Sequence, residues 1–152
     1  MTHISSLQKI GRFIFLLVLV NLIGAISASY MTQDTMIWYH HLPLSKLNPP
    51  DYVFGIVWSI LLFLQVIAAF LVWGKASPRY FVLQLALNML WSFTFFYLRN
   101  PAAALIVVIF FILALMMNIK SFGRANKGAG WLIVPTLLWA LFALYLNSVL
   151  IF

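Results

Sequence analysis

Residues 102–119 read AAALIVVIFFILALMMNI, an apolar run without a charged side chain. A helix needs about 20 such residues to cross the hydrocarbon core of a bilayer. Because lipid offers no partner for backbone N–H and C=O groups, a run of this kind is expected to be helical. Further runs lie at 13–30, 52–73, 80–98 and 131–152. The sequence therefore predicts an all-α membrane protein, a bundle of five transmembrane helices in which residues 1–152 make one domain.

The overall composition supports the same prediction. Hydrophobic residues make up 65% of the chain and charged residues only 7%, whereas soluble domains carry about 25% charged residues. The net charge of +7 comes from bases at the ends of the apolar runs, a distribution typical of topology signals and lipid-phosphate contacts, and nucleic-acid binding is not expected. The absence of cysteine excludes disulfides, thiolate catalysis and cysteine-based metal sites.

The charged residues also predict how the bundle is oriented. One side of the bundle receives Lys9, Arg12, Lys75, Arg79, Lys120, Arg124 and Lys127. The other side receives Lys46 and Arg99 together with Asp34 and Asp51. The positive-inside rule then places the N-terminus inside and the C-terminus outside, with the long connection 31–51 outside. We expect a multi-pass integral membrane protein, and the short connections favour a bacterial membrane.

Proline and asparagine punctuate the ends of the predicted spans. Asn48 precedes Pro49, Pro50 and Asp51, which predicts a helix start with Asn48 as its N-cap. Pro101 is expected to open the fourth span in the same way. The fourth and fifth spans are expected to be joined by a connection over 120–130.

Polar and aromatic side chains recur on particular faces of the spans. Gln84, Asn88 and Ser92 are spaced every four residues and so share one helix face, with Trp91 beside it. Trp58 and Trp91 are expected roughly 10 Å below the outer surface, by the rise of 1.5 Å per residue. With Trp139 they would line one cavity beneath the connection 31–51, which would act as its lid. The fourth span is almost purely aliphatic and is expected to face lipid.

These polar side chains have two interpretations. Polar groups inside a span usually face the bundle interior, where they either contact a ligand or join helices by hydrogen bonds. For Gln84, Asn118 and Asn147 we favour the joining role, whereas for Asn88 and Ser92 both roles remain open. The small residues Gly24, Ala28, Gly55 and Ala143 would leave room for a ligand, or would let helices approach closely.

Ionisable side chains are missing from all the predicted spans. This argues against proton-coupled pumping and acid–base hydrolysis within the membrane. His40 and His41 lie in the outer connection. One of them could ligate haem iron, but a solvated role is favoured for an isolated histidine pair, and no metal site is predicted.

Four ordered sequence blocks carry a resemblance to a known family. The first is Trp38-Tyr39, and the second is Pro49-Pro50-x-x-Val53-Phe54-Gly55-x-Val57-Trp58. The third is Gln84-Leu85-x-Leu87-Asn88-x-x-Trp91-x-x-x-Phe95-Phe96, and the fourth is Pro135-x-x-x-Trp139-x-x-Phe142-Ala143-x-x-x-Asn147. Over nearly its whole length the chain resembles the TspO/translocator protein family, also called tryptophan-rich sensory proteins or peripheral-type benzodiazepine receptors.

The resemblance implies a fold, a ligand class and a site. Members are five-helix, usually dimeric proteins that bind porphyrins, haem, sterols and benzodiazepine-type drugs in a pocket roofed by the first connection. Carried over by motif position, the implied contacts are Tyr39, Trp58, Asn88, Trp91, Trp139 and Ala143. Ser92 follows by adjacency, and the helix faces described above add Phe54, Gly55 and Ala28. The resemblance implies no catalytic residue and no obligatory cofactor, with porphyrin or haem as the ligand and a homodimer as the assembly.

Three functions follow as hypotheses. The first is a membrane receptor or transporter for tetrapyrroles, in which Lys46 or Arg99 at the rim would pair with propionate groups. The second is photo-oxidative porphyrin breakdown with Trp58 and Trp139 as redox-active residues, as the resemblance allows. The third is a membrane scaffold without a small ligand.

Overall fold

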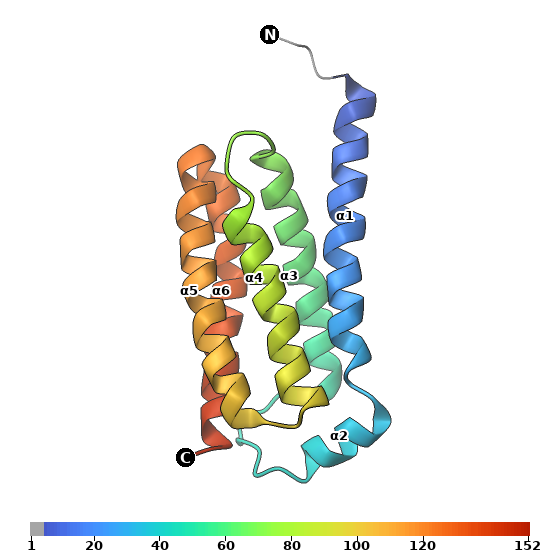
Figure 1. The fold of residues 1–152 in the computed structure, drawn as a ribbon, viewed down its shortest axis with the longest axis vertical. Helices are drawn as coiled ribbons and strands as arrows, with labels where there is room; N and C mark the ends of the chain where they lie inside the picture. The colour runs from blue at the N-terminus through green and yellow to red at the C-terminus, as the bar shows by residue number, and fades with distance from the viewer. Residues whose placement is uncertain (1–4) are drawn as a thin grey trace.

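The computed structural model describes residues 5–152, and the described chain consists of helices joined by turns and loops (Figure 1). Its elements are α1 (Ser6–Ser29), α2 (Gln33–His40), α3 (Asp51–Leu71), α4 (Arg79–Ser92), the π-helix η1 (Phe93–Tyr97), α5 (Pro101–Ala125) and α6 (Lys127–Val149). Within this range, α1, α3, α4 with η1, α5 and α6 are long and apolar enough to cross a membrane. The predicted five-helix membrane bundle is confirmed.

The five long helices form a closed ring. Around it, α1 packs on α3, α3 on α6, α6 on α5, α5 on α4, and α4 on α1 again. The short helix α2 lies across one end of the ring near η1, and the start of α1 and the end of α6 lie at opposite ends of the molecule (Figure 1). This order makes the connection between α1 and α3 a cover over one end of the bundle.

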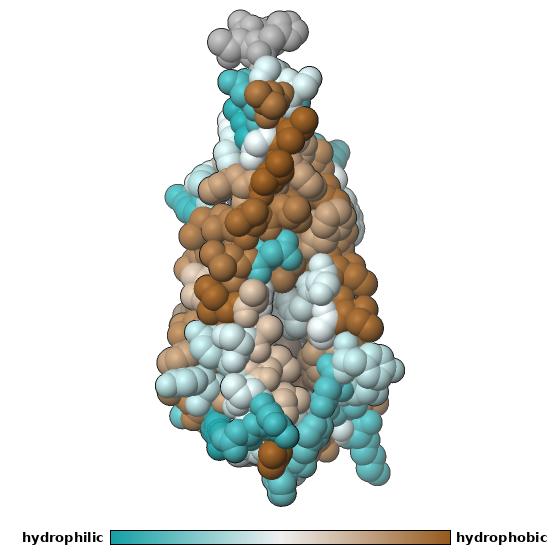
Figure 2. Space-filling model, turned by 90° about the vertical axis from the view of Figure 1, so that its right-hand side faces the viewer, coloured by the Kyte–Doolittle hydropathy of each residue, from teal (hydrophilic) through white to brown (hydrophobic). Residues whose placement is uncertain are grey.

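Apolar side chains cover the outside of the bundle as well as its inside. On α5, Ile106 and Phe110 are 58% and 57% exposed, while Val108 and Phe111 on the opposite face are buried. Figure 2 shows apolar residues across the body of the molecule and hydrophilic residues gathered at the end that carries α2. A surface of this kind suits lipid as its solvent. Helix α5 presents an exposed apolar face, and the contact of this face with lipid stays a prediction.

Both acidic residues lie at the α2 end of the molecule, whereas most Lys and Arg side chains lie at the opposite end. At the α2 end, Arg99 pairs with Asp34, and His40 Nε2 lies 2.8 Å from Asp51 Oδ2. Every other base in the described range except Lys46 falls on the opposite end, on or beside the ends of α1, α3, α4, α5 and α6. This matches the predicted division of charge, while the orientation derived from it stays a prediction.

A chain of buried amides joins three helices at the level of mid-bundle. Gln84 Nε2 donates to Gln65 Oε1 at 2.6 Å, and Gln65 Nε2 donates to Thr136 Oγ1 at 3.1 Å. Asn147 accepts from Trp91 Nε1 at 3.2 Å and donates to the Pro101 carbonyl at 2.8 Å. Gln84 and Asn147 therefore join helices as predicted.

Asn118 on α5 behaves differently from the other amides. It is fully buried, and neither its Oδ1 nor its Nδ2 has a hydrogen-bond partner within residues 5–152. The predicted joining role is therefore wrong for this residue.

The predicted connection over 120–130 is wrong. Helix α5 continues to Ala125 and α6 begins at Lys127, so only Asn126 separates them. Its side chain caps α6 by accepting from Ala129 N at 3.1 Å. Close approach of the two helices is made possible by glycine, since a Cβ on Gly130 would lie 2.9 Å from Gly123 Cα.

Four further helix ends differ from prediction. Helix α1 starts at Ser6, ahead of 13, because Ser5 and Gln8 form a reciprocal capping box. Helix α3 follows Pro50 as its N-cap without a side-chain cap, so Asn48 is not the cap. Beyond these, α6 ends at Val149, before 152, and the span expected to end at 98 finishes as η1.

Candidate functional site

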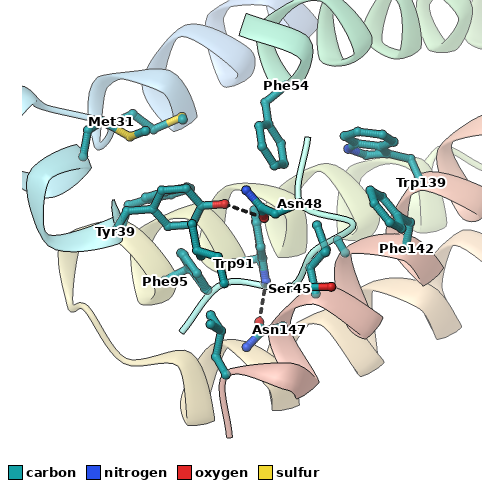
Figure 3. A pocket seen from close by; sticks show the side chains of 16 residues that line it. Met31, Tyr39, Ser45, Asn48, Phe54, Trp91, Phe95, Trp139, Phe142 and Asn147 are labelled. Atoms are coloured by element: carbon teal, nitrogen blue, oxygen red, sulfur yellow. Dashed lines mark hydrogen bonds between the residues drawn. The ribbon is translucent and has the colours of Figure 1, made fainter. Parts of the chain in front are cut away.

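Two adjoining cavities lie in the half of the bundle that carries α2. The lid cavity, of about 40 Å³, lies under α2 and the segment that follows it, between α3, the α4–η1 junction and α6 (Figure 3). The lateral cavity, of about 350 Å³, lies between α1, α3 and α4. Met31, Phe54, Trp91 and Phe96 line both cavities and so form a shared wall. Neither cavity is lined by a charged residue of the described range.

Aromatic rings fill most of the lid cavity. Trp91 stacks on Phe95 with ring centroids 5.4 Å apart, and Phe95 meets Phe96 edge to face at 4.9 Å. Neighbouring residues such as Phe95 and Phe96 face the same cavity because η1 is wound more widely than an α-helix. A cavity of about 40 Å³ accommodates only a few water molecules, so it does not hold a macrocycle in this arrangement.

Two hydrogen bonds fix the walls of the lid cavity (Figure 3). The Tyr39 hydroxyl donates to Asn48 Oδ1 at 2.8 Å, which ties α2 to the segment before α3. Trp91 Nε1 donates to Asn147 Oδ1 at 3.2 Å, which ties α4 to α6. Tyr39 therefore offers its ring to the cavity, while its hydroxyl is already engaged.

Burial raises the pKa of the Tyr39 hydroxyl above its ordinary value of 10.0, opposed by its hydrogen bond to Asn48 and reinforced by the negative charge of Asp51. The group therefore stays protonated, and remains a donor, throughout the physiological pH range. The pKa of the Tyr39 hydroxyl is higher in the folded than in the unfolded protein, so folding favours its protonated form. The stability that this hydroxyl contributes is therefore complete below the unfolded pKa of about 10 and falls as the pH rises beyond it.

Tyr39→Phe is expected to loosen α2 without unfolding the bundle. Loss of the bond to Asn48 removes about 1 kcal/mol from the closed lid, which corresponds to roughly fivefold faster hydrogen exchange in α2. Tyr52→Phe serves as the control, because Tyr52 is 70% exposed and has no hydrogen-bond partner within residues 5–152. Equal exchange rates in the two variants would show that this bond does not hold the lid.

The lateral cavity combines apolar walls with unengaged polar side chains. Trp58 and Trp91 line it, and so do Ser27, Asn88 and Ser92. Asn88 and Ser92 are 4% and 7% exposed, and neither side chain makes a hydrogen bond within residues 5–152. The Ser27 hydroxyl is buried and also lacks a partner in that range. The side chains of Asn88 and Ser92 are therefore available to whatever occupies the cavity, whereas the Ser27 hydroxyl lies behind its wall.

The lateral cavity is open toward the outside of the bundle. Ala25, Ala28, Gly55 and Ser59, on the two helices that flank it, are exposed. The face that carries α1 is hollowed below its middle (Figure 2). An apolar molecule in the surrounding lipid can therefore reach the cavity without crossing water.

All the predicted site residues line one of the two cavities, but they do not share one chamber. Phe54 and Trp91 line both. Tyr39, Trp139 and Ala143 line the lid cavity, whereas Ala28, Gly55, Trp58, Asn88 and Ser92 line the lateral cavity. The structure differs here from the expectation of a single chamber, because the rings of the shared wall separate Trp58 from Trp139.

Several lining residues were not predicted. The lid cavity also receives Met31, Met36, Leu44, Asn48, Phe96 and Phe142. Phe96 and Phe142 were visible in the sequence blocks that carry the family resemblance, so the signal was present. Met31 and Leu44 belong to the connection 31–51, where no periodicity marks which side chains turn inward.

The rim residues divide into free and engaged groups. Arg99 is held by Asp34, so it is not free to pair with a ligand carboxylate. Lys46 is exposed and makes no ion pair within residues 5–152. The imidazoles are engaged as well, His40 with Asp51 and His41 Nδ1 with the Ile37 carbonyl at 2.7 Å.

Comparison with known proteins places the chain in a family. The model of the TspO/MBR family matches residues 14–152. The tryptophan-rich protein TspO of Chlorobaculum tepidum is 31% identical over 82% of this chain and 84% of its own length. The protein of the same name from Archaeoglobus fulgidus is 33% identical over 82% and 85%. The tryptophan-rich sensory protein of Cereibacter sphaeroides is 37% identical over 72% of each chain. The chain is therefore a multi-pass integral membrane protein that belongs to the TspO/MBR family.

Proposed function

We propose that this protein is a membrane receptor or transporter that binds a tetrapyrrole, such as a porphyrin or haem, in the lateral cavity. The observation that carries the proposal is the pair of unengaged polar side chains of Asn88 and Ser92 inside an apolar cavity lined by Trp58 and Trp91. Ligand pockets are mostly apolar with a few such convergent polar groups, and about 350 Å³ lies in their usual range.

The shape of the cavity suits a flat ligand. One wall is formed by indole and phenyl rings, which offer faces for stacking. The opposite side is open, so the edge of a macrocycle can extend beyond the protein. Flat sterols and benzodiazepine-type molecules share these demands and are secondary candidates.

Lys46 is the residue proposed to pair with a propionate at the rim, since Arg99 is engaged by Asp34. The photo-oxidative alternative relied on Trp58 and Trp139 acting on one porphyrin. Because these side chains line different cavities, the arrangement supports binding better than that chemistry.

A titration with protoporphyrin IX tests the proposal. Purified full-length protein in detergent is expected to show quenching of tryptophan fluorescence with a micromolar or lower Kd. Gly55→Leu should weaken this binding at least about tenfold, or about 1.4 kcal/mol, because a side chain there enters open cavity space.

Gly11→Leu is the matched control, since a Cβ at Gly11 meets nothing within 4 Å and Gly11 lines none of the described cavities. Trp58→Phe should weaken binding more than Trp139→Phe, because only Trp58 lines the lateral cavity. If the Gly55→Leu and Gly11→Leu proteins bind equally well, the site is misplaced. If wild-type protein gives no saturable quenching, the proposed ligand class is wrong.

A further inference from the structure

The largest described cavity lies at the end of the bundle opposite α2. It measures about 480 Å³ and lies between the start of α4 with its preceding turn and the last turns of α5. Lys75 and Arg79 line it from the start of α4 and the turn before it, and Lys120 and Arg124 line it from the end of α5. None of these four side chains makes an ion pair within residues 5–152. We call this feature the basic cleft.

Nothing in the described chain neutralises the basic cleft. Asp34 and Asp51 lie at the other end of the molecule, where each has a basic partner of its own. Helix α4 begins beside the cleft, where Arg79 N donates to Ser77 Oγ at 3.4 Å and the N-cap residue Pro78 provides no side-chain cap, so the positive end of the helix dipole faces the same space. All four side chains are exposed, so water and salt already screen their mutual repulsion, and an anion between them reduces it further.

The remaining lining specifies the kind of anion. Ser77, Tyr80 and Ser121 contribute hydroxyl groups that can donate to phosphate oxygens. Met117, which lies toward mid-membrane from Lys120 on α5, is 49% exposed and lines the same cleft. The cleft is therefore basic at the end of the bundle, and it becomes apolar toward mid-bundle, where it meets the exposed apolar surface of α5.

We propose that the basic cleft is a binding site for a phosphate group, supplied by the headgroup of an anionic phospholipid whose acyl chain runs along α5 past Met117. Guanidinium and ammonium groups bind phosphate through charge-assisted hydrogen bonds. Basic pockets at the ends of transmembrane helices are where such headgroups are recognised. This site is separate from the two cavities at the α2 end, so it can be occupied together with a ligand there.

The experiment compares lipids on the full-length protein. Thermal unfolding in detergent micelles is measured while phosphatidylglycerol, phosphatidylcholine or inorganic phosphate is added. Phosphatidylglycerol is expected to raise the Tm saturably, and phosphatidylcholine is not. In Arg79→Gln with Arg124→Gln, the phosphatidylglycerol concentration at half-effect should rise at least about tenfold, because each base contributes on the order of 1 kcal/mol.

The control removes two charges from the same end outside the basic cleft. Lys9→Gln with Lys127→Gln should retain the wild-type response, since neither residue lines the cleft. If both double variants lose the response equally, the attraction is diffuse and the site does not exist. If inorganic phosphate gives the same shift at the same concentration, the lipid source is overturned. An equal effect of phosphatidylcholine would overturn recognition of anionic headgroups.

Discussion

Gly130→Ala is expected to lower the Tm by several degrees. The added Cβ would lie 2.9 Å from Gly123 Cα, 3.1 Å from Gly123 N and 3.1 Å from the Ile119 carbonyl oxygen. All three are backbone atoms, so no side-chain rotation relieves the contact. Overpacking of this kind costs about 1–3 kcal/mol, more than the ~1 kcal/mol that alanine gains over glycine as a helix former.

The facing glycine provides the control. A Cβ on Gly123 would meet Gly130 Cα at 3.9 Å, an ordinary contact distance. Gly123→Ala should therefore leave the Tm unchanged or raise it slightly. Circular dichroism of both variants during heating in the same detergent measures the difference. A Gly130→Ala protein as stable as Gly123→Ala would mean that α5 and α6 do not approach as closely as described.

Gln65→Leu is expected to destabilise the protein by about 2–3 kcal/mol. Gln65 is fully buried and is the middle member of the amide chain between α4 and α6. Its loss leaves Gln84 with no partner for Nε2, and Gln84 Oε1 already has none within residues 5–152. A buried amide left without any partner costs about 1–3 kcal/mol for each group.

A double variant tests whether Gln65 and Gln84 stabilise the protein through their mutual hydrogen bond. Gln84→Leu alone leaves Gln65 Oε1 without its donor but also removes the unpartnered Gln84 Oε1, so its net cost should be about 1 kcal/mol or less. Gln65→Leu combined with Gln84→Leu should be more stable than Gln65→Leu alone, because replacing both partners by apolar groups is nearly neutral. Denaturation of the four proteins in one detergent completes the cycle. Additive losses would show that the two amides do not interact.

The spans themselves could be predicted from sequence because length and hydropathy alone decide them. The run at 102–119 contains no charge to interrupt it, and the structure places its residues in α5. What failed was the continuation of helices beyond the hydrocarbon. Lys120 and Arg124 suggested a connection, yet a helix needs no apolar residue once it has reached the headgroup region, and Asn126 marks where it ends.

The candidate site was predictable residue by residue but not as a shape. The spacing of Asn88 and Ser92 correctly placed them toward an interior cavity, and the structure leaves them without hydrogen bonds. The division of the space by Phe54 and Phe96 depends on their side-chain rotamers and on the π-helical turn η1. No periodic pattern in the sequence predicts either feature. The short helix α2 was missed because its eight residues bury too little to show a pattern. The homodimer remains a prediction.

The π-helix η1 also constrains how the length of this chain can vary. Its wide turn closes with Leu98 N donating to the Phe93 carbonyl at 3.0 Å, and the Thr94 hydroxyl donates to the Leu90 carbonyl at 2.9 Å. Deletion of one residue from η1 would tighten the turn and rotate the residues that follow it by about 100° around the helix axis. Arg99 would then face away from Asp34. Relatives should therefore keep the residue count between Trp91 and Arg99 fixed, and place their insertions or deletions between α2 and α3.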